Sequence, residues 1–114
     1  MKTASFFTFT GPGRISIARF APRNTPAGFR VYRALAPGAW FHETNFAEYA
    51  RMYAEQLAEL DVERVWADLH HLACDHEPVL LCYERPPFTA TNWCHRRLVA
   101  SWFEQFGHQV DEID

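Results

Sequence analysis

The segment that most constrains the fold is the continuous apolar run VLLCY, from Val79 to Tyr83. Pro78 precedes this run and Pro86 follows it, and the run is too short for an ordinary helix. Apolar residues at every position are typical of a parallel strand that is covered on both faces. We therefore predict a central strand here, with helices packed around it.

Three helices are predicted around this strand. Asn45 and Glu48 have the spacing of a capping box, and apolar residues follow them at helical intervals. Asp61 is suited to cap a second helix, which the sequence CDHEP ends. A third helix is expected after the central strand, with Thr91 or Asn92 as its cap.

The remaining strands are expected near the two ends of the chain. Residues 6–9 and 15–20 alternate between apolar and polar types, as in strands. The turn TGPGR between them is too short for a parallel crossover, which predicts an antiparallel or edge arrangement. Residues 21–41 are rich in proline, glycine and arginine, so irregular structure is expected, and residues 110–113 form a last short strand.

These elements predict a single α/β domain over residues 1–114. We expect a small three-layer-like arrangement, with a mostly parallel central sheet flanked by helices and an antiparallel edge supplied by the N-terminal strands. The apolar runs are too short for a membrane helix, and the first ten residues lack the apolar core of a secretory signal. Three cysteines cannot all pair. A cytoplasmic location without a membrane partner is predicted.

The charges are distributed unevenly along the chain. Residues 1–40 carry six cations and no acid, whereas the rest carries five cations and all fourteen acids, which gives the net charge of −3. A basic N-terminal third suits a phosphate-binding face. The acidic balance of the whole chain argues against nonspecific binding to duplex nucleic acid.

Reactive side chains cluster where the central strand ends and the third helix begins. Cys82 and Glu84 leave the strand, while Cys94, His95 and Arg96 stand in the first turn of the helix. Strand ends and helix N-termini meet at one edge of a parallel sheet, so these groups are expected at a common rim. A helix N-terminus with adjacent guanidinium groups favours a bound anion and lowers the pKa of a thiol.

Helical geometry refines these assignments. His95 falls on the apolar stripe of its helix, so its ring should be partly buried and needs a partner such as Glu84. A Glu–His pair can act as an acid–base couple. Cys82 is expected to pack in the core, and Arg97 to project towards solvent. The candidate catalytic residues are Glu84, Cys94 and His95, and the candidate ligand-binding residues are Arg19, Arg23 and Arg96.

A second cluster consists of His70, His71, Cys74 and His76. His70 and Cys74 share a helix face, but the spacing matches no common zinc pattern. Histidines near a helix C-terminus are also favourable to the helix dipole. We therefore assign no metal and no cofactor. The signatures of dinucleotide loops, Walker loops, nucleophile elbows and zinc deaminases are missing from the sequence.

Several motifs together resemble the domain-of-unknown-function 488 family. They are VLLCYE from Val79, CHRRLVASW from Cys94 and GHQVDEI from Gly107, with ISIARFAPR, YRALAP and FAEYARMYAEQL in the N-terminal half. The resemblance implies a small cytosolic α/β protein of bacterial or phage type, similar to the short members of the family. The loop RPPFTATNW is longer than in many members. The characteristic polar positions that the resemblance implies are Cys82, Glu84, Cys94, His95 and Arg96, with Arg19 and Pro22 upstream.

The family has no settled activity, so three functions remain open. The first is a small enzyme or enzyme-like protein whose rim binds a phosphate-bearing ligand, either a nucleotide or a nucleic-acid end. The second is a non-catalytic module that binds nucleic acid or a protein, in which Arg96 pairs with Glu84 and His95 makes a hydrogen bond in the core. The third, which the sequence favours less, is thiol redox or metal chemistry at Cys82 and Cys94.

Overall fold

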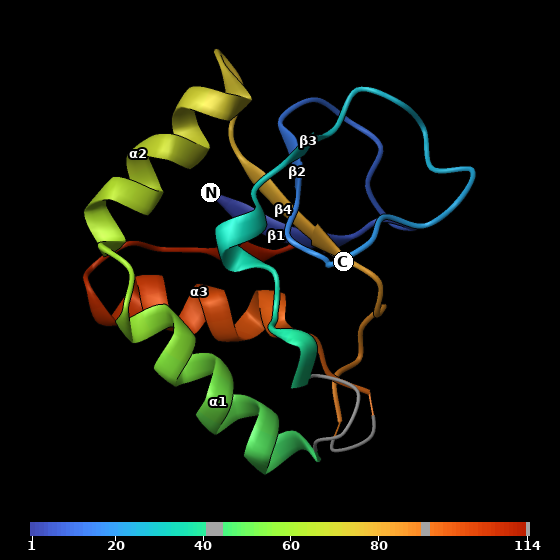
Figure 1. The fold of residues 1–114 in the computed structure, drawn as a ribbon. Coiled ribbons are helices and arrows are strands. Elements are labelled where there is room, and N and C mark those ends of the chain that lie inside the picture. Colours follow the sequence, from blue (N-terminus) through green and yellow to red (C-terminus); the bar gives the residue numbers. More distant parts are fainter. Residues whose placement is uncertain (41–44, 90–91, 114) are drawn as a thin grey trace.

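The computed structural model describes residues 1–40, 45–89 and 92–113. It is an α/β domain in which helices pack against a five-stranded sheet (Figure 1), which confirms the predicted class. The elements in chain order are β1 (Lys2–Ser5), β2 (Arg14–Ser16), β3 (Arg30–Val31), a 3₁₀ helix η1 (Arg33–Leu35), α1 (Phe46–Ala58), α2 (Val62–Ala73), β4 (Val79–Cys82), α3 (His95–Gln105) and β5 (Asp111–Glu112).

The predicted central strand is confirmed. The strand order is β3-β2-β4-β1-β5, so β4 lies in the middle of the sheet. Leu81 is in register with Ala4 of β1 and with Ser16 of β2, and both pairings are parallel. The four residues of β4 are all buried, as a strand covered on both faces requires.

The predicted antiparallel edge is wrong, because every strand pair in the described sheet is parallel. The strands β1 and β2 are not neighbours, since β4 lies between them. Because β1 and β2 both run parallel to β4, the residues between them carry the chain back to the end of the sheet at which the strands begin. Gly13 makes this return possible: its φ is +84°, and an added Cβ would lie 2.1 Å from the carbonyl oxygen of Glu77.

The first two helix caps are confirmed. The Asn45 side chain accepts a hydrogen bond from the backbone N–H of Glu48 at 2.9 Å, which begins α1. The Asp61 carboxylate accepts from the backbone N–H groups of Glu63 and Arg64, which begins α2. Both caps satisfy N–H groups that have no partner within their helix.

The predicted cap of the third helix is wrong. The N-cap of α3 is Cys94, two residues after Asn92, and its side chain makes no capping hydrogen bond. The Asn92 amide instead donates to the carbonyl oxygens of Arg85 and Pro87, which holds the preceding loop closed. Thr91, the other predicted cap, lies outside the described residues.

Two buried clusters form the core. The larger one joins Ile15 and Leu80 of the sheet, and Ile17 directly after β2, to apolar residues from all three helices. The members of the smaller one, such as Ala4 and Leu81, lie in strands and loops. The helices gather on one side of the sheet (Figure 1), so loops cover much of the other face. In the parts of the chain that the structure describes, no helix combines the length and the apolar character needed to cross a membrane.

Candidate functional site

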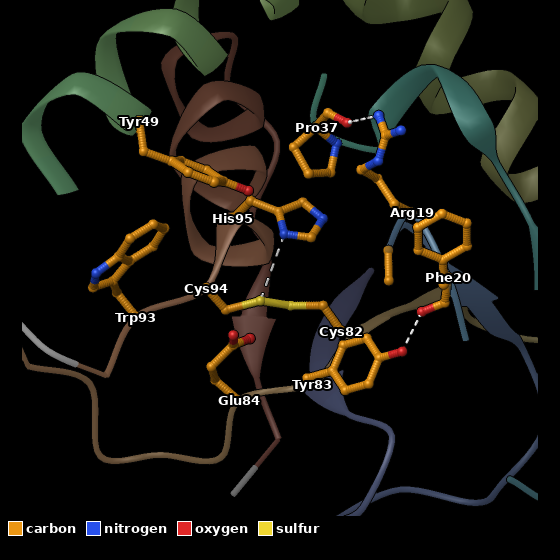
Figure 2. Close-up of a pocket in the computed structure, with 11 residues that line it drawn as sticks. Arg19, Phe20, Pro37, Tyr49, Cys82, Tyr83, Glu84, Trp93, Cys94 and His95 are labelled. Atoms are coloured by element: carbon orange, nitrogen blue, oxygen red, sulfur yellow. Dashed lines mark hydrogen bonds between the residues drawn. A yellow bond between two sulfur atoms is a disulfide. The ribbon is translucent and has the colours of Figure 1, made fainter. Parts of the chain in front are cut away.

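A pocket of about 470 Å³ lies beyond the ends of β2 and β4 (Figure 2). Its walls come mainly from the chain after β2, the chain after β4 and the start of α3, and they also include Pro37 after η1 and Tyr49 of α1. The C-terminal ends of parallel strands meet at this edge, where ligand sites of parallel sheets are usual. The lining residues are Ala18, Arg19, Phe20, Pro37, Tyr49, Cys82, Tyr83, Glu84, Trp93, Cys94 and His95.

A disulfide between Cys82 and Cys94 forms part of the pocket wall. Cys82 is the last residue of β4 and Cys94 is the N-cap of α3, so the bond ties the strand to the helix. The two residues are only 1% and 4% exposed. Burial agrees with the expectation that Cys82 packs in the core, but Cys82 also contributes a sulfur to the pocket.

His95 is held by a hydrogen bond to the backbone. Its Nε2 lies 2.7 Å from the carbonyl oxygen of Ile17, which can only accept, so Nε2 carries the proton. The other ring nitrogen, Nδ1, lies 3.7 Å from the sulfur of Cys94 (Figure 2). Burial lowers the pKa of His95 to about 4; the Ile17 hydrogen bond opposes this shift and the Arg96 charge adds to it. The imidazole is therefore neutral at pH 7 and presents a lone pair to Cys94.

Arg96 does not line the pocket. Its side chain is fully buried and forms a salt bridge to Glu112, with 2.8 Å between Nη2 and a carboxylate oxygen. Its Nη1 donates to the sulfur of Cys82 at 3.2 Å, and its guanidinium carbon lies 4.9 Å from the centre of the Phe88 ring. Arg96 thus stands behind the disulfide as a positive charge compensated by Glu112, and it does not pair with Glu84.

Glu84 lines the pocket but does not meet the predicted partner. The ring nitrogens of His95 contact Ile17 and Cys94 instead, and within the described parts of the chain no hydrogen bond or ion pair engages the Glu84 carboxylate. Its charge adds to the effect of burial in raising the pKa values of Tyr49 and Tyr83. Both phenols are therefore neutral hydrogen-bond donors beside the carboxylate.

The other predicted arginines are placed differently from one another. Arg19 lines the pocket, and its Nη1 donates to the carbonyl oxygen of Pro37 at 3.2 Å. Arg23 is exposed and is not among the lining residues. Arg97, which was expected to face solvent, is half-buried and donates to the hydroxyl of Thr3 at 2.9 Å.

The histidine-rich cluster at the end of α2 does not gather around a common point. His70 Nδ1 bonds to the carbonyl oxygen of Trp66 in the same helix, and Cys74 is exposed. Among the described residues, the group of ligand atoms close enough to share an ion is formed by Cys82, Cys94 and His95. These atoms lie within 4.8 Å of one another.

Sequence reasoning missed two features of the site. The aromatic wall includes Tyr49 and Trp93, whose rings are 4.5 Å apart and which also belong to or pack against the larger buried cluster. The partner of Arg96, Glu112, was also missed, since it lies in β5, two strands away from β4. An acid in the last strand was the available signal, but only the parallel pairing of β1 with β5 brings that strand near Arg96.

The comparisons with known proteins identify a family. The model of a family described as "Domain of unknown function DUF488" matches residues 19–103, about three quarters of the chain. The matched segment begins at Arg19 and contains β4, the disulfide and most of α3. Neither the curated proteins nor the solved structures gave a significant match. The family match agrees with the motifs at Val79 and Cys94, and the chain belongs to the DUF488 family.

Proposed function

We propose that this protein acts as a thiol–disulfide exchange protein on a small ligand bound in the pocket. The supporting observation is the position of the Cys82–Cys94 pair: it forms part of the pocket wall, and each sulfur has its own polar neighbour. A buried disulfide with a purely structural role needs neither an adjoining pocket nor such neighbours.

The two cysteines differ in their surroundings, which suggests different roles. Cys94 stands at the N-terminus of α3, beside the unprotonated Nδ1 of His95, and is the more exposed of the pair. Nδ1 can accept a hydrogen bond from the Cys94 thiol. The N-terminus of the helix favours the thiolate form, which is the form that attacks. Cys82 faces the Arg96 guanidinium, which stabilises a negative sulfur when the bond to Cys82 breaks or forms.

The exchange proceeds in two steps. The Cys94 thiolate attacks one sulfur of a substrate disulfide, which releases the first substrate thiolate and leaves a mixed disulfide on Cys94. The Cys82 thiolate then attacks the Cys94 sulfur, releases the second substrate thiolate and forms the Cys82–Cys94 bond. The protein dithiol loses two electrons and the substrate gains them, while the two thiolates take up the two protons that the cysteines lost. The predicted cytoplasmic location agrees with this role, because disulfides there are usually catalytic or redox-sensing.

A redox assay with matched variants tests the proposal. Reduced wild-type protein is mixed with a small aliphatic disulfide, and thiol release and the mass of the chain are followed. We expect Cys74→Ser to behave like the wild type, Cys82→Ser to accumulate a mixed disulfide on Cys94, and Cys94→Ser to lose the reaction. A pair that stays oxidised in the folded protein under strong thiol reductant, or exchange that survives in Cys94→Ser, would exclude this function.

A second candidate is the binding of a phosphate-bearing ligand, either a nucleotide or a nucleic-acid end. Arg19 in the pocket wall supports it, but Arg96 is committed to Glu112, and the Glu84 carboxylate in the same wall opposes a polyanion. A thermal-shift screen with nucleotides and inorganic phosphate tests this candidate. This candidate requires that nucleotide or phosphate raises the unfolding temperature of the wild type and of Arg23→Gln, but not that of Arg19→Gln. If the chain binds nucleic acid or a protein, and Cys94→Ser leaves that binding unchanged, the result would instead support the non-catalytic module.

A further inference from the structure

Three potential metal ligands surround one point in the pocket wall. The sulfurs of Cys82 and Cys94 and a ring nitrogen of His95 lie within 4.8 Å of one another, and all three residues are buried. Figure 2 shows the histidine ring beside the two sulfurs. Thiolate and imidazole are the ligands that zinc prefers in proteins. Two cysteines and one histidine are also a known three-residue set of catalytic zinc sites.

The orientation of His95 suits a ligand. Its Nε2–H donates to the carbonyl oxygen of Ile17 at 2.7 Å, so Nδ1, the nitrogen next to Cys94, carries the lone pair. Histidines that bind metals usually donate their second ring N–H to a carbonyl or carboxylate, which fixes the ring and the tautomer. The bond to Ile17 therefore holds the ring ready before any ion arrives.

The charges around the sulfurs also fit an ion. Two thiolates and a neutral imidazole balance the two positive charges of a zinc ion. The Arg96 guanidinium is itself compensated by Glu112 at 2.8 Å, and its Nη1 donates to the Cys82 sulfur at 3.2 Å. An N–H donor on a ligating sulfur is a supporting contact of the kind that tunes metal sites.

The space available permits both states of the pair. The Cα atoms of Cys82 and Cys94 are 7.0 Å apart, slightly beyond the usual Cα separation of a disulfide. An ion thus has room between the sulfurs once the bond is reduced. Three protein ligands leave a fourth position, and the pocket adjoins all three residues. Glu84 lines the same pocket with a carboxylate that can take a proton from a water bound at that position.

We propose that the reduced protein binds a zinc-like divalent ion through Cys82, Cys94 and Nδ1 of His95, with the fourth coordination position open to the pocket. The inference rests on the proposed function in one respect, because the disulfide must open. Binding releases two protons from the two thiols. A small-molecule disulfide reverses it: the two thiolates give up two electrons and form the Cys82–Cys94 bond, the reagent takes the electrons and two protons to become two thiols, and the ion leaves. Metal and disulfide therefore exclude each other.

Cobalt binding provides a direct test. Wild-type protein is reduced, freed of metal and titrated with Co²⁺ without oxygen, and thiolate-to-cobalt charge-transfer absorption is recorded. We expect one ion per chain, loss of the band when a disulfide reagent is added, and displacement of cobalt by Zn²⁺. The variants Cys94→Ser and His95→Gln should weaken cobalt binding by at least about tenfold. Loss of a residue that only supports a ligand already lowers metal affinity by about this factor, and these two variants remove a ligand itself.

A matched control separates this site from the cluster on α2. The double variant His71→Gln, Cys74→Ser should bind cobalt as the wild type does, because both side chains are exposed and neither lines the pocket. Folding of each variant is checked by its thermal unfolding. Absence of a thiolate band in reduced, folded wild-type protein overturns the site, and so does binding that is lost only in the α2 variant.

The outcomes also separate this inference from the proposed function. Reduced protein that exchanges disulfides but takes up no cobalt overturns the metal site alone. Reduced protein that binds cobalt but exchanges no disulfide overturns the exchange function alone. A Cys82–Cys94 pair that cannot be reduced in the folded protein overturns both.

Discussion

Acidification should destabilise the folded protein through His95. The pKa of this buried imidazole is lowered from 6.5 to about 4. Between these two values the unfolded chain binds a proton at His95 that the folded chain does not, so the free energy of unfolding falls as the pH falls. Below about pH 4 both states are protonated and the loss is complete. At about 1.4 kcal/mol per pKa unit, the loss between pH 7 and pH 4 amounts to about 3 kcal/mol.

The variant His95→Gln isolates this contribution. Glutamine keeps an amide N–H that can donate to the carbonyl oxygen of Ile17, but it does not titrate. Urea unfolding of the oxidised wild type and the variant is measured from pH 7 to pH 4, and the difference between their unfolding free energies is plotted. The other five of the six histidines are common to both proteins and cancel. We expect the advantage of the wild type to shrink by about 3 kcal/mol. Parallel pH profiles would refute the reasoning.

Three further changes test the packing that holds the site. Arg96→Met should lower the unfolding free energy by about 3 kcal/mol, because it leaves the largely buried Glu112 carboxylate without its cation. The double variant Arg96→Met, Glu112→Leu should recover most of this loss, and urea unfolding measures both effects. Gly13→Ala should cost about 2 kcal/mol in the same assay, since φ is +84° and the new Cβ meets a backbone carbonyl; an unchanged midpoint would contradict this. Tyr53→Phe should cost about 1–2 kcal/mol by thermal unfolding, because the buried phenol donates to the carbonyl oxygen of Leu35.

Features set by neighbouring residues were predictable from the sequence. The strand β4 follows from an apolar run between prolines, and the starts of α1 and α2 follow from Asn45 and Asp61, whose side chains bond to N–H groups two or three residues away. Strand ends and helix starts meet at one edge of a parallel sheet. That rule predicts that Cys82 and His95 lie at the same edge, and both line the pocket.

Features set by distant partners were not predictable in the same way. The segments around β1 and β2 read as a hairpin because nothing in them indicates that β4 comes between them. The sequence suggests the nearby Glu84 as the partner of Arg96, whereas Glu112 reaches Arg96 through β5. The sequence also suggests a carboxylate partner for His95, but its Nε2–H donates to the backbone carbonyl of Ile17. A buried polar group requires a partner, but the sequence does not say which one.

The central position of β4 has a consequence for how the chain acquires its structure. In the described sheet, β2 with β3 forms one half and β1 with β5 the other, and β4 joins them. Both halves therefore depend on a strand that is synthesised after more than two thirds of the chain. The strands β1 and β2 do not pair with each other, so they can join one sheet only after Val79–Cys82 has been synthesised. Because contacts between residues far apart in sequence slow folding, completion of the sheet depends on the strand that carries Cys82.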